Sequence, residues 1–201
     1  MNRSAIWEKA DAFRVSPALK GNNVPPLDMM YVVDVALEFD VVEIPNMTAD
    51  LRMEAAIVPL EKTLYIDQEA IDAWEKKTYW MERRLRFTLA HELGHYVLHE
   101  DFLSELSFSD VSEFKRWMLA HRNNRNLENE ANEFAGRFLV PIEILREEYD
   151  EFTLKMADAD PEWNLIEGMR ERLARRIAPR FGVNYQVIET RFDHEGLWLL
   201  E

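Results

Sequence analysis

The sequence predicts an α+β fold that is mostly helical and carries a small three-stranded sheet. The helical part is predicted by segments whose apolar residues recur at helical spacing, above all residues 85–98 and 127–139. The sheet is predicted by three short apolar runs at residues 41–44, 55–58 and 63–66. We expect the sheet to pack on the helices, because both must bury an apolar face.

Further helices are predicted by the same apolar spacing and by capping residues. They are expected at residues 1–14, from residue 29 onward, and at 67–80, 112–121, 142–152, 163–181 and 185–192. Asp28 and Asn184 are the candidate N-caps of two of them. Irregular chain is expected at residues 17–26, 100–110, 122–126 and 157–161. We expect a core domain over residues 1–150 and a C-terminal helical extension over residues 151–201 that packs on it.

The composition indicates a folded, acidic protein. Of the 201 residues, 47% are hydrophobic, which is enough for a core, and the formal charge is −14. This charge argues against direct binding to nucleic acid, although it could attract a basic protein partner. Cysteine is absent, so a transition metal would need His, Asp or Glu as ligands.

No segment predicts a membrane partner. The first residues are polar and mixed in charge, and the most apolar stretch, Met29–Phe39, contains Asp34 and Glu38 and is too short to span a bilayer. We therefore expect a cytoplasmic protein. Its oligomeric state is not indicated.

The helical segment at residues 85–98 contains an HExxH motif, formed by His91, Glu92 and His95. Residues four apart on a helix differ by about 40° in direction, so both histidines face one side and can hold a Zn²⁺ ion. Glu92 is turned about 100° from His91, which places its carboxylate where it can take a proton from a metal-activated water. The motif thus predicts two metal ligands and a general base.

The surroundings favour a metal site over a chance match. Leu85, Leu89 and Leu93 form an apolar row, so the helix is expected to be largely buried. Polar side chains in such a helix are costly without a metal or a hydrogen-bond network. Gly94 costs about 1 kcal/mol inside a helix, which indicates that another part of the chain approaches closely there.

A zinc ion held by two histidines needs a third protein ligand, and glutamate completes a known hydrolytic set. Glu128 precedes the apolar stripe of the second segment and has Asn132 one turn later. We expect Glu128 to bind the metal and Asn132 to support the site. Glu130 and Glu133 lie on other faces and are expected to be solvent-exposed acids. Glu130 is the next candidate if Glu128 is not the ligand.

Other ligands have less support. An extended motif with a glycine turn would bring in a later residue, but Leu98 stands at the glycine position and Asp101 at the ligand position. His99 lies about 80° round the helix from the first motif histidine, so it is expected to pack or to support a ligand. His121 and His194 have no assigned role.

Two segments resemble the ImmA/IrrE family of metallo-endopeptidases, RFTLAHELGHYVLH at residues 86–99 and ENEANEFAGRFLVP at residues 128–141. The likeness covers roughly residues 28–141. It implies a thermolysin-like zincin core with one Zn²⁺ per chain, bound by His91, His95 and Glu128, and with Glu92 as general base. It also implies a substrate class, because relatives cleave helix-turn-helix repressors.

The chain departs from the family pattern in two places. The segment between His99 and Glu128 is long and could reshape the substrate cleft, and LVP stands where LMP is commoner. Residues 181–184 resemble the family's FGVS-type ending, which implies a helix-turn-helix-like tail packed on the core.

Together these observations predict a zinc-dependent endopeptidase that hydrolyses a peptide bond in a protein substrate, implied to be a DNA-binding repressor. The alternative is a metallopeptidase-like module that binds or senses a regulatory protein without cutting it. The intact motif together with Glu128 favours the enzyme, since a binding module has no need of Glu92. A structural protein with a chance motif would bind no metal. The residue that stabilises the oxyanion is not indicated, because Tyr96 points off the ligand face.

Overall fold

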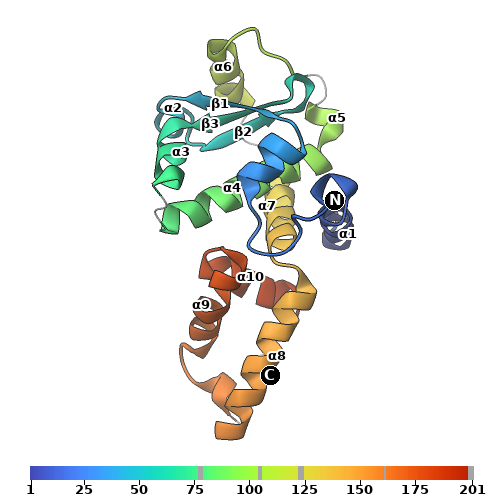
Figure 1. Ribbon diagram of the computed structural model, residues 1–201, viewed down its shortest axis with the longest axis vertical. Coiled ribbons are helices and arrows are strands. Elements are labelled where there is room, and N and C mark those ends of the chain that lie inside the picture. The colour runs from blue at the N-terminus through green and yellow to red at the C-terminus, as the bar shows by residue number, and fades with distance from the viewer. Residues whose placement is uncertain (77–78, 104–105, 122–124, 161, 199–201) are drawn as a thin grey trace.

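The computed structural model describes residues 1–76, 79–103, 106–121, 125–160 and 162–198 (Figure 1). Short 3₁₀ helices are labelled η, and η2 is a π-helix. The elements are α1 (Arg3–Arg14), η1 (Pro17–Leu19), η2 (Tyr31–Ala36), β1 (Asp40–Ile44), α2 (Met47–Leu51), β2 (Ala55–Val58), η3 (Pro59–Glu61), β3 (Thr63–Asp67), α3 (Gln68–Glu75), α4 (Tyr79–Leu98), α5 (Glu100–Leu103), α6 (Val111–His121), α7 (Arg125–Leu139), α8 (Ile142–Ala159), η4 (Trp163–Leu165), α9 (Met169–Phe181) and α10 (Tyr185–His194). Among the described helices, none is long and apolar enough to cross a membrane.

The strands form one mixed sheet in the order β1-β3-β2, with β1 parallel and β2 antiparallel to β3. Successive side chains point to opposite faces of a sheet. Ile57 and Leu64 share the main core with the apolar row of α4. Ala56 and Tyr65 face the other way and pack with Phe114 of α6. The sheet therefore lies between α4 and α6, as Figure 1 shows. Strand β2 forms one edge of the sheet and β1 forms the other.

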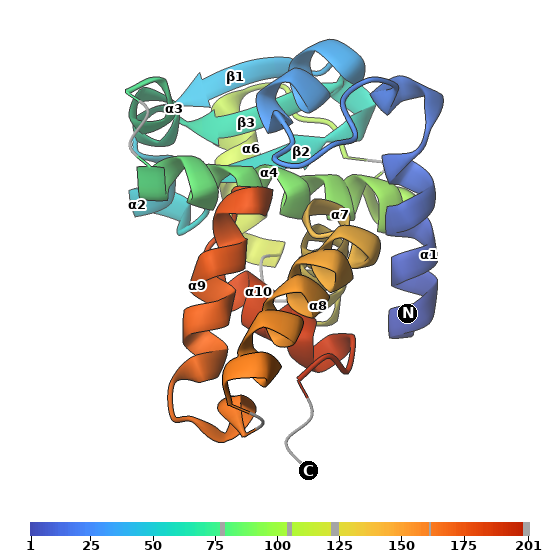
Figure 2. The same ribbon diagram turned by 60° about the horizontal axis from the view of Figure 1, so that its bottom comes forward.

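Helix α4 crosses beneath the sheet (Figure 2). Helix α7 packs against α4 on the side of α4 that faces away from the sheet. The C-terminal helices α8, α9 and α10 follow α7 and form the lower half of the molecule in Figure 1. Leu173 and Ile177 of α9 and Phe192 of α10 are buried in the same core cluster as α4 and α7. Residue 150 lies inside α8, and the division into a core and an extension at this position stays a prediction.

The α+β class and its three strands are confirmed, and each strand agrees with its predicted bounds to within one residue. Asp28 accepts a hydrogen bond from the Tyr31 N–H at 3.1 Å, as an N-cap does. Asn184 occupies the N-cap position of α10, but its side chain makes no capping hydrogen bond, so that expectation was wrong.

Three expectations about where helices and irregular segments lie need correction. Part of the expected irregular segment 100–110 is helical, because α5 covers residues 100–103. Helix α8 extends into the expected break at residues 157–161 and ends at Ala159. Residue 161 lies outside the described residues, as do 77–78 and 122–124. Residues 163–181 are not one helix, since Gly168 adopts a left-handed conformation (φ +75°) between η4 and α9.

Candidate metal centre

The close crossing of α4 and α7 positions the site. Gly94 lies at the crossing, where a Cβ atom would come within 2.9 Å of the Cα and carbonyl oxygen of Ala131. The close approach expected at Gly94 is therefore real, and the backbone of α7 is what approaches. Glu128 lies one turn before Ala131, so this contact brings its carboxylate to the histidines of α4.

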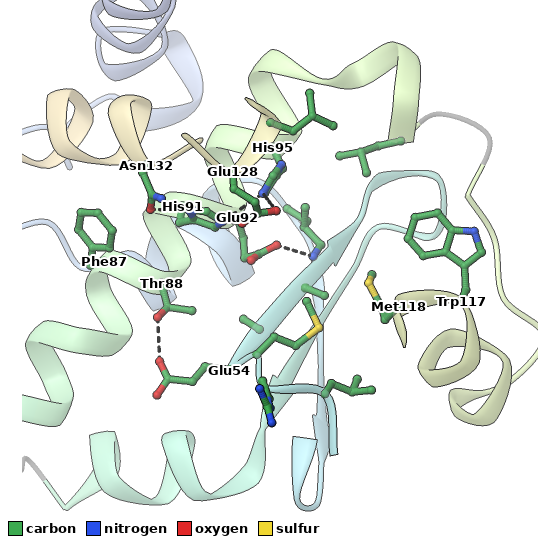
Figure 3. A pocket seen from close by; sticks show the side chains of 18 residues that line it. Glu54, Phe87, Thr88, His91, Glu92, His95, Trp117, Met118, Glu128 and Asn132 are labelled. Atoms are coloured by element: carbon green, nitrogen blue, oxygen red, sulfur yellow. Dashed lines mark hydrogen bonds and ion pairs between the residues drawn. The ribbon is translucent and has the colours of Figure 1, made fainter. Parts of the chain in front are cut away.

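Three side chains converge at this point, as Figure 3 shows. The Nε2 atoms of His91 and His95 lie 3.1 Å apart. The Glu128 carboxylate oxygens lie 3.2 Å from His91 Nε2 and 3.4 Å from His95 Nε2. One donor atom from each of the three residues falls within 4.8 Å of the others. A divalent cation at the centre of such a set would have two imidazole ligands and one carboxylate, which is a set used for hydrolytic zinc.

The pKa shifts of Glu128 and His91 show that the group carries negative charge, which suits a cation. Hydrogen bonds from His91 and His95 hold the pKa of Glu128 well below its usual range. Burial by itself lowers the pKa of His91, but the hydrogen bond to Glu128 and the charge of Glu92 outweigh it and raise the pKa above its ordinary value. The donors therefore fit a metal ion, and without one the carboxylate is held by the two rings.

Glu92 is turned toward the sheet edge rather than toward Glu128. Its side chain is buried, and Oε2 accepts a hydrogen bond from the Ile57 N–H of β2 at 3.1 Å. Burial raises the pKa of Glu92, and the nearby charges of His95 and His91 only partly oppose this effect. Sequence reasoning did not find the Ile57 N–H, because a backbone donor leaves no signal in residue identity.

Each histidine of the motif has a second polar partner through Nδ1. His91 Nδ1 lies 3.0 Å from Asn132 Oδ1, which places Asn132 in the supporting position expected for it. His95 Nδ1 lies 3.0 Å from His99 Nδ1, and His99 Nε2 lies 3.1 Å from Glu130 Oε2. His99 thus contacts a candidate ligand, in the supporting position expected for it, and burial lowers its pKa.

The expectation that Glu130 and Glu133 are solvent-exposed was wrong. Both carboxylates are mostly covered, with 17% and 12% of the side chain exposed. Glu130 contacts His99, and Glu133 contacts Arg191 of α10 at 3.0 Å. Glu130 is not among the residues that converge with the two motif histidines.

The remaining candidates lie away from the centre. Among the described residues, the one group that could hold a metal contains neither His99, Asp101 nor His194. His194 Nδ1 instead lies 2.7 Å from Glu133 Oε2. The side chain of His121 lies outside the described part of the chain. Tyr96 packs edge-on against Phe39 with 5.3 Å between ring centroids, so it faces away from the ligands as expected.

A cleft of about 600 Å³ opens onto the three donors. The edge strand β2 lines one side, and Phe87, Thr88 and the α7 residues Glu128 and Asn132 line another. Helix α6, which belongs to the long segment after His99, adds Trp117 and Met118 (Figure 3). The segment between His99 and Glu128 therefore does shape the cleft, and its length in the sequence was the feature that predicted this.

Comparison with protein families agrees with the geometry. A search among curated proteins finds no match to this chain. A family model does match, over residues 79–193, which include α4, α7 and the three converging side chains; it describes the IrrE N-terminal-like domain of the M78 peptidases. Because the match covers more than half of the chain, this protein belongs to the M78 peptidase family of IrrE N-terminal-like domains.

Proposed function

We propose that this protein is a zinc-dependent endopeptidase. The observation that supports this most directly is the convergence of His91, His95 and Glu128 within 4.8 Å. The buried Glu92 follows His91 in the sequence and lines the same cleft. Family membership supports a metallopeptidase-like function independently of this geometry. His₂Glu is a ligand set of catalytic zinc, which keeps one coordination position open for substrate or water.

In the proposed reaction, zinc when bound would activate a water molecule and polarise the scissile carbonyl. Glu92 accepts a proton from the attacking water and passes it to the leaving amine as the carbon–nitrogen bond breaks. The Ile57 N–H holds one oxygen of this carboxylate, so the side chain keeps a single orientation. Burial of Glu92 increases its affinity for a proton, which suits a general base.

We propose that the substrate binds as an extended strand along β2. The hydrogen bond from the Asp67 N–H to the Glu54 carbonyl fixes the alternation of the backbone: the N–H and C=O groups of residues 56 and 58 point toward β3. Those of Ile57 point toward α4 and the cleft. Backbone groups alternate along a strand, so Ala55 shares the outward direction of Ile57. The Ile57 N–H is bound to Glu92, so the added strand would pair with the backbone of Ala55 and with the Ile57 carbonyl. An added strand would pass directly over the three donors, because both residues line the same cleft as His91 and Glu128.

The proposed protein substrate is a helix-turn-helix repressor, as the resemblance to the ImmA/IrrE family implies. The charge of this chain supports the pairing, since a formal charge of −14 attracts the basic surface that a DNA-binding domain carries. Cleavage of such a repressor would place the protein in transcriptional regulation.

The test compares the natural chain with Glu92→Gln after both have been loaded with zinc. Each is incubated with a peptide library of mixed sequence and with purified helix-turn-helix repressors from the source genome. We expect one zinc per chain in both proteins and cleavage by the natural chain alone. Equal cleavage by Glu92→Gln would contradict the mechanism. Zinc and repressor binding without cleavage in either protein would instead support the non-cutting binding module.

A further inference from the structure

His99 and Glu130 form a chain of contacts that ends on one ring of the candidate metal centre. His99 follows His95 by one helical turn, and their Nδ1 atoms lie 3.0 Å apart. On its other side His99 Nε2 lies 3.1 Å from Glu130 Oε2, on α7. Only 5% of the His99 side chain is exposed, so these contacts are shielded from solvent.

The positions of the protons follow from these contacts. Nε2 of His95 is the atom that faces Glu128 and His91, so this nitrogen must keep its lone pair free for a metal. With a metal bound at Nε2, the proton of His95 would therefore lie on Nδ1 and would be donated to His99 Nδ1. A ring that accepts at Nδ1 carries its own proton on Nε2, and His99 donates that proton to Glu130. One arrangement of protons satisfies both hydrogen bonds.

We propose that His99 and Glu130 act together as positioning residues that fix the tautomer and ring orientation of His95. The inference rests on the metal site proposed above, but not on cleavage of any particular substrate. The carboxylate of Glu130 is itself held in place, because its other oxygen contacts the α-amino group of Met1. An acceptor so placed makes the ligand histidine more basic and reduces the ring motion that binding must arrest.

The two metal histidines are thereby supported in different ways. Asn132 of α7 accepts directly from His91 Nδ1, whereas Glu130 of α7 reaches His95 Nδ1 through the intervening imidazole of His99. Glu130 lies two residues from Glu128 on the same helix, so α7 supplies both a candidate ligand and the anchor for another ligand.

The experiment measures zinc affinity by competition with a chromophoric chelator. We expect His99→Leu, which removes the acceptor, to weaken zinc binding about ten- to a hundredfold. His99→Asn places an amide oxygen near the former Nδ1 position, so we expect it to recover much of that loss. Glu100→Gln is the control, since this exposed neighbour should leave affinity unchanged.

A double-mutant cycle tests whether Glu130 acts through His99. Glu130→Gln should weaken zinc binding in the natural chain but add little in the His99→Leu background. Long-range ¹H–¹⁵N spectra of the zinc-loaded protein should show His95 protonated at Nδ1, with that proton signal shifted or lost in His99→Leu. If His99→Leu fails to fold, His99→Asn and Glu130→Gln carry the measurement.

Two outcomes would overturn the inference while leaving the endopeptidase intact. Either His99→Leu binds zinc as tightly as the natural chain, or the effects of His99→Leu and Glu130→Gln simply add. Failure of the natural chain to bind zinc would instead remove the metal site, and with it both proposals. These outcomes are distinguishable because zinc affinity, the proton signal and peptide cleavage are measured separately.

Discussion

Glu92, the proposed general base, is an acid whose burial lowers the stability of the fold. Burial raises its pKa, so the folded chain holds a proton on this carboxyl at pH values where the unfolded chain has released it. The resulting penalty is absent below the unfolded pKa, grows as pH rises toward the folded pKa and is complete above it. Glu92→Gln should therefore abolish cleavage and make the metal-free protein more stable at neutral pH. Thermal unfolding followed from acid to neutral pH measures the difference, which should vanish at the acid end.

Glu128 should behave in the opposite way. Hydrogen bonds from His91 and His95 lower its pKa, so it stabilises the fold above its unfolded pKa and loses this effect as pH falls through the folded pKa. Glu128→Gln should destabilise the metal-free protein slightly at neutral pH, since the side chain is half exposed, and should remove zinc binding. The same unfolding series tests both variants. A stability change of equal sign in Glu92→Gln and Glu128→Gln would contradict this assignment of the two carboxylates.

At the scale of residues, spacing in the sequence was sufficient to predict where the motif histidines lie, but it did not predict the surroundings of all the acids. The four-residue step of HExxH places His91 and His95 together without knowledge of the fold, and the structure brings them within 3.1 Å. Glu130 and Glu133 were expected at the surface because they lie on other faces of the helix. Their partners, His99 and Arg191, lie far away in the sequence and so were not foreseen. Helical periodicity identifies the apolar face of a helix. It does not indicate which side chain from a distant part of the sequence packs against the polar face.

At the scale of elements, the packing of α4 on α7 assembles the site. A Cβ atom at Gly94 would lie 2.9 Å from backbone atoms of Ala131, and backbone cannot swing aside as a side chain can. Gly94→Ala should push α7 away, destabilise the fold by about 1–3 kcal/mol and weaken zinc binding, because Glu128 moves with α7. Gly136→Ala on α7 is a matched control, since its Cβ would meet only the Arg191 side chain at 3.4 Å. Equal zinc affinity in the two variants would show that the close crossing does not position Glu128.

Elements with a clear apolar pattern were predictable from the sequence, and elements without one were not. Helices α4 and α7 each present a buried face that the sequence pattern reveals, and β2 and β3 are buried along their whole length. Helix α5 has four residues, too few to display a period, and it continues from α4 through a hydrogen bond from the Leu103 N–H to the His99 carbonyl. The interruption before α9 depends on the conformation of Gly168, which the apolar spacing of residues 163–181 does not reveal.

At the scale of the whole molecule, a buried ionic network joins the C-terminal helices to the core. Arg191 of α10 is 1% exposed and contacts Glu133 of α7 at 3.0 Å, as well as Glu195. Arg137 of α7 binds Glu195 at 2.6 Å and Asp11 of α1, also at 2.6 Å. Three helices that are distant in the sequence thus share one set of charges beside the crossing that forms the candidate metal centre.

Removing the central cation of this network should therefore loosen the attachment of α10. Arg191→Met keeps an unbranched side chain but leaves Glu133 and Glu195 covered with fewer partners, so we expect a loss of about 3–5 kcal/mol in the free energy of unfolding. Lys155→Met is the control: its i,i+4 pair with Glu151 is 61% exposed on both sides and should contribute at most about 1 kcal/mol. Denaturant unfolding measures both losses, and hydrogen exchange should show faster exchange in α10 of Arg191→Met. Equal losses in the two variants would mean that apolar packing alone holds the C-terminal helices on the core.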